Sequence, residues 1–117
     1  MPRERAPNPV SSLAEWIEES ASAQSGRWAM GDPDHVPLGS YAKETLQRLG
    51  VWDRVAPRVL PAPSARAALR LVETGEADFG IVYRTDALAS DGATMVAEFP
   101  AMDGAQVEVM GLSLIHI

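Results

Sequence analysis

The sequence contains no cysteine, which excludes disulfide bonds, thiolate chemistry and zinc sites built on cysteine. It also has no apolar run close to the roughly 20 residues that a membrane-spanning helix needs. Its first residues, MPRERAPNPV, include basic side chains but lack the apolar stretch that follows them in a signal peptide. We therefore expect neither a membrane span nor a signal peptide in this chain.

Positive charge is scarce, because 10 Lys and Arg residues stand against 16 Asp and Glu residues, for a net charge of −6. An acidic surface repels phosphate backbones and anionic lipids, so we expect no nucleic acid or membrane partner. The remaining composition, 46% hydrophobic and 22% charged, is that of an ordinary globular protein. A length of 117 residues is enough for one domain with a buried core.

Apolar periodicity and turn residues divide the chain into alternating helices and strands. Residues 1–12 contain three prolines and no periodicity, so we expect a loose, extended leader there. Strands that alternate with helices of about ten residues predict an α/β fold with a mostly parallel sheet and helices on both faces. The patterns predict helices over residues 13–22, 40–49 and 65–75, a helical turn over 85–90, and strands over 27–30, 58–60, 78–83, 93–99 and 106–110.

Three predicted loops follow the carboxyl ends of strands, which is where parallel sheets bind ligands. They are GDPDHVPLG (31–39), PAPSA (61–65) and YRTDA (83–87). The first two lead into helices, whose first N–H groups are free and lie at the positive end of the helix dipole. Each is therefore a candidate anion site. Tyr83, at the end of its strand, can bring a hydroxyl to the same place, although a core position is the alternative.

Polar side chains crowd the first of these loops. Asp32, Asp34 and His35 have the oxygen and imidazole ligands of a metal site, and Ser40 with His35 and Asp32 has the composition of a catalytic triad. Three side chains within four residues seldom converge on one metal ion without distant partners. We interpret the two aspartates as turn formers that bond nearby N–H groups, and His35 as a residue that orders the loop. We expect no enzyme activity and no bound metal cation.

Longer blocks of the sequence resemble one family. The blocks GRWAMGDPDHVPLGSYAKETLQRLGVW, PSARAALRLVETGEADFGIVYRTDALAS and MVAEFP are similar to the second half of periplasmic molybdate-binding proteins, the soluble receptors of molybdate ABC transporters. The resemblance covers about residues 26–110, and its most specific parts are GDPxHVPxG and GIVYxTDA. It implies one lobe of a two-lobed, type II periplasmic-binding-protein fold, with residues 13–110 forming a truncated second lobe.

The resemblance also implies a ligand and a set of donors. A molybdate or tungstate oxyanion would be held by the backbone N–H of Leu38, the backbone N–H of Ala65 and the hydroxyl of Tyr83, with no cofactor. The family usually has alanine where Leu38 stands, so a larger side chain here could crowd the cleft, although a backbone donor survives the change. The missing first lobe would supply two serines, and an ABC permease would be the partner of the intact, periplasmic parent. The alternative is a stand-alone small-anion-binding or regulatory effector module of the same fold.

The last six residues, 112–117, match no pattern of that family. Leu112 to Ile117, LSLIHI, is what a transposon end sequence used in sequencing-library preparation would encode. We therefore expect residues 111–117 to be a non-native tail. A natural, apolar C-terminal strand is the alternative.

Overall fold

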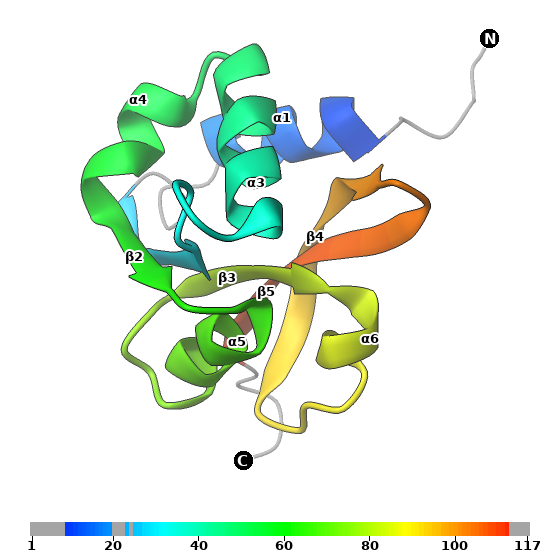
Figure 1. Ribbon diagram of the computed structural model, residues 1–117. Helices are drawn as coiled ribbons and strands as arrows, with labels where there is room; N and C mark the ends of the chain where they lie inside the picture. Colours follow the sequence, from blue (N-terminus) through cyan, green and yellow to red (C-terminus); the bar gives the residue numbers. More distant parts are fainter. Residues whose placement is uncertain (1–8, 20–22, 24, 113–117) are drawn as a thin grey trace, which may run out of the picture.

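A computed structural model describes residues 9–19, 23 and 25–112 of the chain, and its centre is a five-stranded sheet with helices on both faces (Figure 1). Helices α1, α3 and α4 lie on one face, and α5 and α6 lie on the other. No helix in these ranges is both long enough and apolar enough to cross a membrane. The elements are α1 (Pro9–Glu19), β1 (Trp28–Gly31), α3 (Pro37–Arg48), α4 (Trp52–Val55), η1 (Ala56–Arg58), β2 (Val59–Ala62), α5 (Ala65–Glu73), β3 (Phe79–Tyr83), α6 (Arg84–Ala87), β4 (Ala93–Met102) and β5 (Ala105–Leu112).

The strand order is β2-β1-β3-β5-β4. Strands β2, β1 and β3 are mutually parallel, whereas β5 is antiparallel to both β3 and β4. Four strands therefore run in one direction and β5 alone runs against them, which confirms the predicted mostly parallel α/β sheet. Strands β4 and β5 form a hairpin whose turn residues, Asp103 and Gly104, have φ values of 49° and 85°. Positive φ at both central residues is what a type I′ hairpin turn requires.

Two helices begin at least three residues earlier than the sequence pattern predicts, and both begin at a proline. Helix α1 starts at Pro9, so the extended leader predicted over residues 1–12 is wrong for residues 9–12; residues 1–8 lie outside the described ranges. Helix α3 starts at Pro37 instead of residue 40. Proline is usually a helix breaker, but at the first helical position its missing N–H costs nothing and its fixed φ suits the helix.

Strand β5 ends later than predicted. It continues through Gly111, which pairs with Phe79, to Leu112, which pairs with Ala93. The boundary expected at residue 110 is therefore wrong by two residues, because both keep their place in the sheet. Residues 113–117 of the predicted tail lie outside the described residues, and the non-native origin of that tail stays a prediction.

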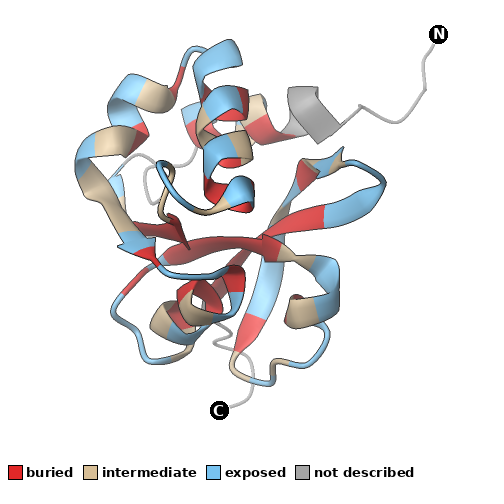
Figure 2. Cartoon of the chain, in the orientation of Figure 1, coloured by how far each residue is buried: buried red, intermediate tan, exposed pale blue. Residues whose placement is uncertain are grey.

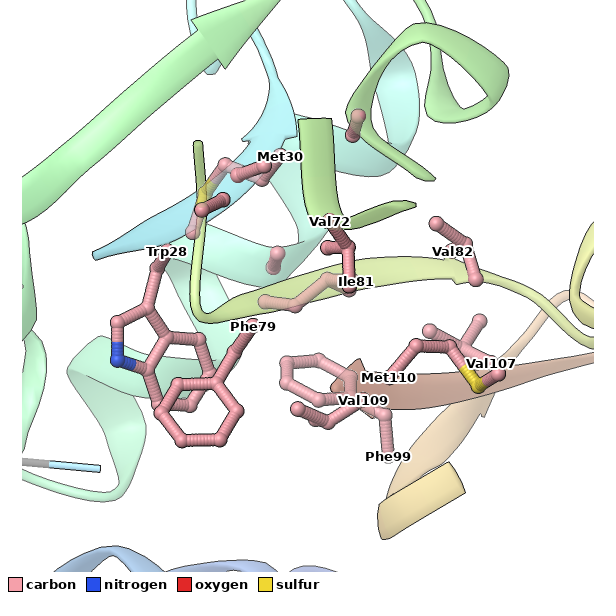
Figure 3. Close-up of a cluster of buried hydrophobic side chains, with 14 of the residues drawn as sticks. Trp28, Met30, Val72, Phe79, Ile81, Val82, Phe99, Val107, Val109 and Met110 are labelled. Carbon is pink, nitrogen blue, oxygen red and sulfur yellow. The ribbon is translucent and has the colours of Figure 1, made fainter. Parts of the chain in front are cut away.

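Apolar side chains fill both faces of the sheet (Figures 2 and 3). On the α1 face, Trp16 packs edge-on against Phe79, with ring centroids 5.1 Å apart, and Trp28 packs beside both rings. On the opposite face Gly80 has no side chain, which lets Val72 of α5 approach the strand closely. The alternation of residues 79 and 80 between the two faces follows from the two-residue period of a strand. This core fixes the positions of β1, β2 and β3, whose ends carry the candidate site.

Candidate functional site

The carboxyl ends of three parallel strands meet at one edge of the sheet. Gly31, the last residue of β1, pairs with Ala62, the last residue of β2. The N–H of Asp32 donates to the carbonyl oxygen of Ala62 over 2.8 Å, which joins the loops that follow these strands. Strand β3 pairs with β1 in the same direction and ends at Tyr83. The three segments that the sequence singles out therefore follow strands at one edge, although the third, residues 83–87, is mostly helix α6 and not a loop (Figure 1).

The first turn of α3 has backbone donors without acceptors. Val36 caps the helix without a side-chain hydrogen bond, and Pro37 has no N–H. The first donor inside the helix is Ser40, whose N–H bonds to the carbonyl of Val36 over 3.0 Å. Within the described residues, the N–H groups of Leu38 and Gly39 bond to no protein acceptor. Leu38 is only 1% exposed, so its larger side chain is packed in the core.

The first turn of α5 is similar but has a side-chain cap. The Ser64 hydroxyl accepts the N–H of Ala67 over 3.1 Å, and the Ser64 carbonyl accepts that of Ala68 over 3.0 Å. In the described part of the chain, the N–H groups of Ala65 and Arg66 bond to no protein acceptor. Both predicted main-chain positions, Leu38 and Ala65, thus lie in helix first turns that carry the partial positive charge of the helix dipole.

Tyr83 closes β3 and is half-buried. Its hydroxyl lies 3.9 Å from the sulfur of Met102, and a thioether is a weak hydrogen-bond acceptor. The single hydrogen of this hydroxyl is therefore only weakly engaged and can turn to a stronger acceptor. Tyr41 differs, because its hydroxyl contacts the carbonyl oxygens of Pro100 and Ala101 at 3.1 and 2.9 Å.

The loop after β1 is held by Asp32. One carboxylate oxygen accepts the N–H of Asp34 over 3.0 Å, and the other lies 2.9 Å from Nδ1 of His35. The bond from Asp34, followed by that from His35, lowers the pKa of Asp32, and the same carboxylate raises the pKa of His35. These contacts confirm Asp32 as a turn former and His35 as a residue that orders the loop. Asp34 takes part through its backbone N–H, and the same role for its carboxylate stays a prediction. In the described ranges, no group of three or more His, Cys, Asp or Glu side chains could hold a metal ion.

A hollow of about 520 Å³ opens between the loops that follow β1 and β2. A second hollow, of about 500 Å³, lies between α5 and α6 and is lined by charged side chains from both helices. Neither hollow includes Leu38, Ala65 or Tyr83 in its lining. The lining of the first consists of Asp32, His35, Val36, Pro61, Ala62 and Pro63.

Gly39 is a residue that the sequence analysis missed. A Cβ atom at this position would overlap the carbonyl oxygen of Gly31, so the start of α3 packs directly on the end of β1. The signal was present in the sequence, because the loop GDPDHVPLG ends in a second glycine. Close approach of two backbone segments is a common reason for glycine at a ligand site.

Comparison with known proteins identifies relatives of this chain. It is 55% identical over 83 residues to the molybdate-binding protein ModA of Escherichia coli (strain K12), an overlap of 71% of this chain and 32% of that protein. It is 46% identical over 87 residues to ModA of Haemophilus influenzae (strain ATCC 51907 / DSM 11121 / KW20 / Rd), covering 74% of this chain and 33% of the relative. It is 43% identical over 79 residues to the putative ABC transporter substrate-binding lipoprotein YvgL of Bacillus subtilis (strain 168), an overlap of 68% of this chain and 30% of that protein.

The chain therefore spans about a third of the length of these curated relatives. A family model described as bacterial extracellular solute-binding protein matches residues 1–114, which is nearly the whole chain. The α/β sheet with helices on both faces is consistent with a lobe of such a protein. On this evidence the chain belongs to the family of bacterial extracellular solute-binding proteins.

Proposed function

We propose that this chain forms one lobe of an ABC-transporter receptor for molybdate or tungstate. The proposed donors are the backbone N–H groups of Leu38 and Ala65 and the hydroxyl of Tyr83. The observation that carries the proposal is that these donors stand at one edge of the sheet, and that no strong acceptor within the described residues uses them. The relatives named as molybdate-binding proteins supply the identity of the ion.

Local donors must supply the affinity, because a net charge of −6 repels a dianion at long range. A hydrogen bond to a charged acceptor contributes about 1.5–3 kcal/mol, and donors at helix starts gain from the helix dipole. Donors fixed on secondary structure also select for size, since a smaller tetrahedral ion such as sulfate cannot reach all of them. Molybdate and tungstate are nearly equal in size, so both fit the proposal.

The rest of the receptor would complete the site. A second lobe, with its own donors, would close over the ion and exclude water, and the closed form would present the surface that a membrane permease reads. This places the intact receptor outside the cytoplasmic membrane, in the periplasm of a bacterium that has an outer membrane. No cofactor or catalytic group enters this function.

The proposal can be tested by titrating the ¹⁵N-labelled chain with sodium molybdate and following its amide resonances by NMR. We expect the amides of Leu38 and Ala65 to shift most, with a millimolar midpoint because only part of the donor shell is present. Sodium sulfate at the same ionic strength should shift them less. Unmoved amides at both positions would refute the proposal, and binding as tight as that of the full-length relatives would refute its restriction to one lobe.

A proline substitution isolates one donor. Ala65 is the first residue of α5, where proline fits the helix, and Ser64 before it is extended, as a residue before proline prefers. Ala65→Pro therefore deletes the N–H without breaking the helix. We expect molybdate binding to weaken by roughly tenfold or more, from the loss of one charge-assisted hydrogen bond. Ala65→Ser, which keeps the N–H, is the matched control and should bind like the unaltered chain.

A further inference from the structure

Glu108 is a buried carboxylate between two buried valines of β5. Among the described residues, Thr45 and Glu108 are the buried polar ones, and Glu108, which is 7% exposed, is the ionisable one. Its neighbours Val107 and Val109 are fully buried apolar residues. Burying a charge is costly unless an opposite charge lies close to it. The placement of Glu108 therefore calls for a specific partner.

That partner is Arg84. Its Nε lies 3.8 Å from Oε2 of Glu108, and its Nη1 lies 3.2 Å from Oε1 of Gln106, so two side chains of β5 hold one guanidinium. Glu98 of β4 is directly opposite Glu108 in the sheet register. Like charges directly opposite each other in a strand pair repel, so the cation of Arg84 also offsets this repulsion.

The ion pair lies on the opposite face of the sheet from the proposed hydroxyl donor. Glu108 pairs with Val82, so both side chains point to the α5 face, whereas Tyr83 pairs with Val107 and points to the α3 face. Arg84 follows Tyr83 directly, and its backbone therefore stands at the edge of the candidate site. Its guanidinium, however, is drawn to Glu108.

We propose that Glu108 determines the ion specificity of the site by holding the Arg84 guanidinium away from the bound oxyanion. This inference rests on the proposed function. Neutral donors at fixed positions discriminate between tetrahedral ions by size. A free guanidinium binds carboxylate, sulfate, phosphate and molybdate alike, because its attraction is to charge and its side chain adjusts its position. Glu108 thus acts as a positioning residue, through Arg84, and does not itself contact the ion.

Charge-neutral substitutions test the inference through the ratio of molybdate to sulfate affinity, measured by NMR titration with the two sodium salts at constant ionic strength. Glu108→Gln should free Arg84, raise sulfate affinity by roughly tenfold and lower the ratio, since a guanidinium adds a charge-assisted hydrogen bond to a dianion. Arg84→Gln should leave the ratio unchanged, because Arg84 does not touch the ion in the unaltered chain. The double variant Glu108→Gln with Arg84→Gln should restore the ratio.

Two further variants complete the design. Arg84→Lys changes a half-exposed side chain and keeps the positive charge, but it loses the forked contact with Gln106 and Glu108. It should therefore lower the molybdate-to-sulfate ratio, by a smaller factor than Glu108→Gln does. Arg48→Gln removes the same charge from the last turn of α3, where Arg48 pairs with Glu44, and should leave the ratio unchanged.

The outcomes separate this inference from the proposed function. The inference is supported if Glu108→Gln lowers the molybdate-to-sulfate ratio and the double variant restores it. If Glu108→Gln does not fold, a lowered ratio in Arg84→Lys supports it instead. Suppose that the Leu38 and Ala65 amides of the unaltered chain respond to molybdate, but that the molybdate-to-sulfate ratio is unchanged in Glu108→Gln and in Arg84→Lys wherever they fold. That result overturns the role of Glu108 and leaves the proposed function standing. An equal loss of selectivity in the single and double Glu108 variants also overturns it, since the effect would then be independent of Arg84. No molybdate response in the unaltered chain overturns the proposed function, and this inference with it.

Discussion

Tyr83 and Tyr41 are the two tyrosines of the chain, and their hydroxyl groups have different surroundings. Among the described residues, the Tyr83 hydroxyl bonds only to a thioether sulfur, so Tyr83→Phe should change the free energy of unfolding little. Under the proposed function it should weaken molybdate binding by roughly tenfold or more, because a bond to a charged acceptor is lost. Denaturant unfolding and NMR titration of the same sample measure the two effects.

Tyr41→Phe is the matched control, because it removes the same group from a hydroxyl that bonds to backbone carbonyls. It should lower the free energy of unfolding by about 1 kcal/mol and leave molybdate binding of the folded chain unchanged. If both substitutions affected only stability, Tyr83 would be a packing residue, as the alternative interpretation of its strand position holds.

His35 and Asp32 make the loop after β1 sensitive to pH, in two separate windows. The pKa of His35 is raised by Asp32, so its contribution to stability is complete below the ordinary imidazole pKa and disappears as the pH rises through the folded value. The pKa of Asp32 is lowered, so its contribution is present above the ordinary carboxyl pKa and disappears as the pH falls through the folded value. We expect Asp32→Asn to return the pKa of His35 toward its ordinary value, as measured by NMR.

The stability effect of this pair should be small, because the His35 side chain is 80% exposed. His35→Gln should therefore lower stability slightly at pH values below the imidazole pKa and not at all at high pH. The reverse pH dependence would show that the neutral imidazole, and not the imidazolium, is the form that orders the loop.

At the scale of elements, the contact of α3 with β1 is the junction that presents the first-turn amides. Gly39→Ala would place a Cβ against the carbonyl oxygen of Gly31, so α3 must shift. We expect a loss of about 1–3 kcal/mol of stability, typical of overpacking, and weaker molybdate binding because Leu38 moves with the helix. Gly92→Ala is the control, since a Cβ there meets only ordinary contacts, and it should change neither quantity. Equal stability of the two variants would mean that the junction is not tightly packed.

The sequence predicts the elements well where the signal is local. Strands β1, β2 and β3 are predicted to within two residues, because each is a short apolar run bounded by glycine, proline or charged residues. The starts of α1 and α3 are not predicted correctly, because a proline that ends an element and a proline that begins a helix look alike in a single sequence. The sequence analysis did not single out Asp103-Gly104, the turn of the β4–β5 hairpin, although Asp-Gly is a hairpin signal. The position of β5 between β3 and β4 depends on pairing between distant segments.

The same distinction applies to the candidate site. The shared edge of the three loops follows from parallel strands, and parallel topology follows from the alternation of helices and strands. Nothing local in the sequence brings Glu108 to Arg84, because their contact requires the register of β5 against β3. The tight approach of Gly39 to Gly31 is likewise a property of the folded backbone, although the two glycines mark the place.

For the whole molecule, the decisive quantity is the distribution of charge. The chain carries a net charge of −6, and its radius of gyration is 13.5 Å. At about 0.01 M salt the Debye length is about 30 Å, so an approaching molybdate ion is repelled by charges across the entire molecule. At about 0.1 M salt this length is about 10 Å, and only nearby groups are felt.

We therefore expect molybdate binding to strengthen by about twofold to threefold when sodium chloride is raised over this range, because long-range repulsion is screened while the short hydrogen bonds persist. NMR titrations at the two salt concentrations measure the change. A site that held the ion through an exposed guanidinium or ammonium would show the opposite sign, since salt would screen an attraction. The sign of the salt dependence thus distinguishes an ion held by backbone amides and a phenol from one held by a cation such as Arg84.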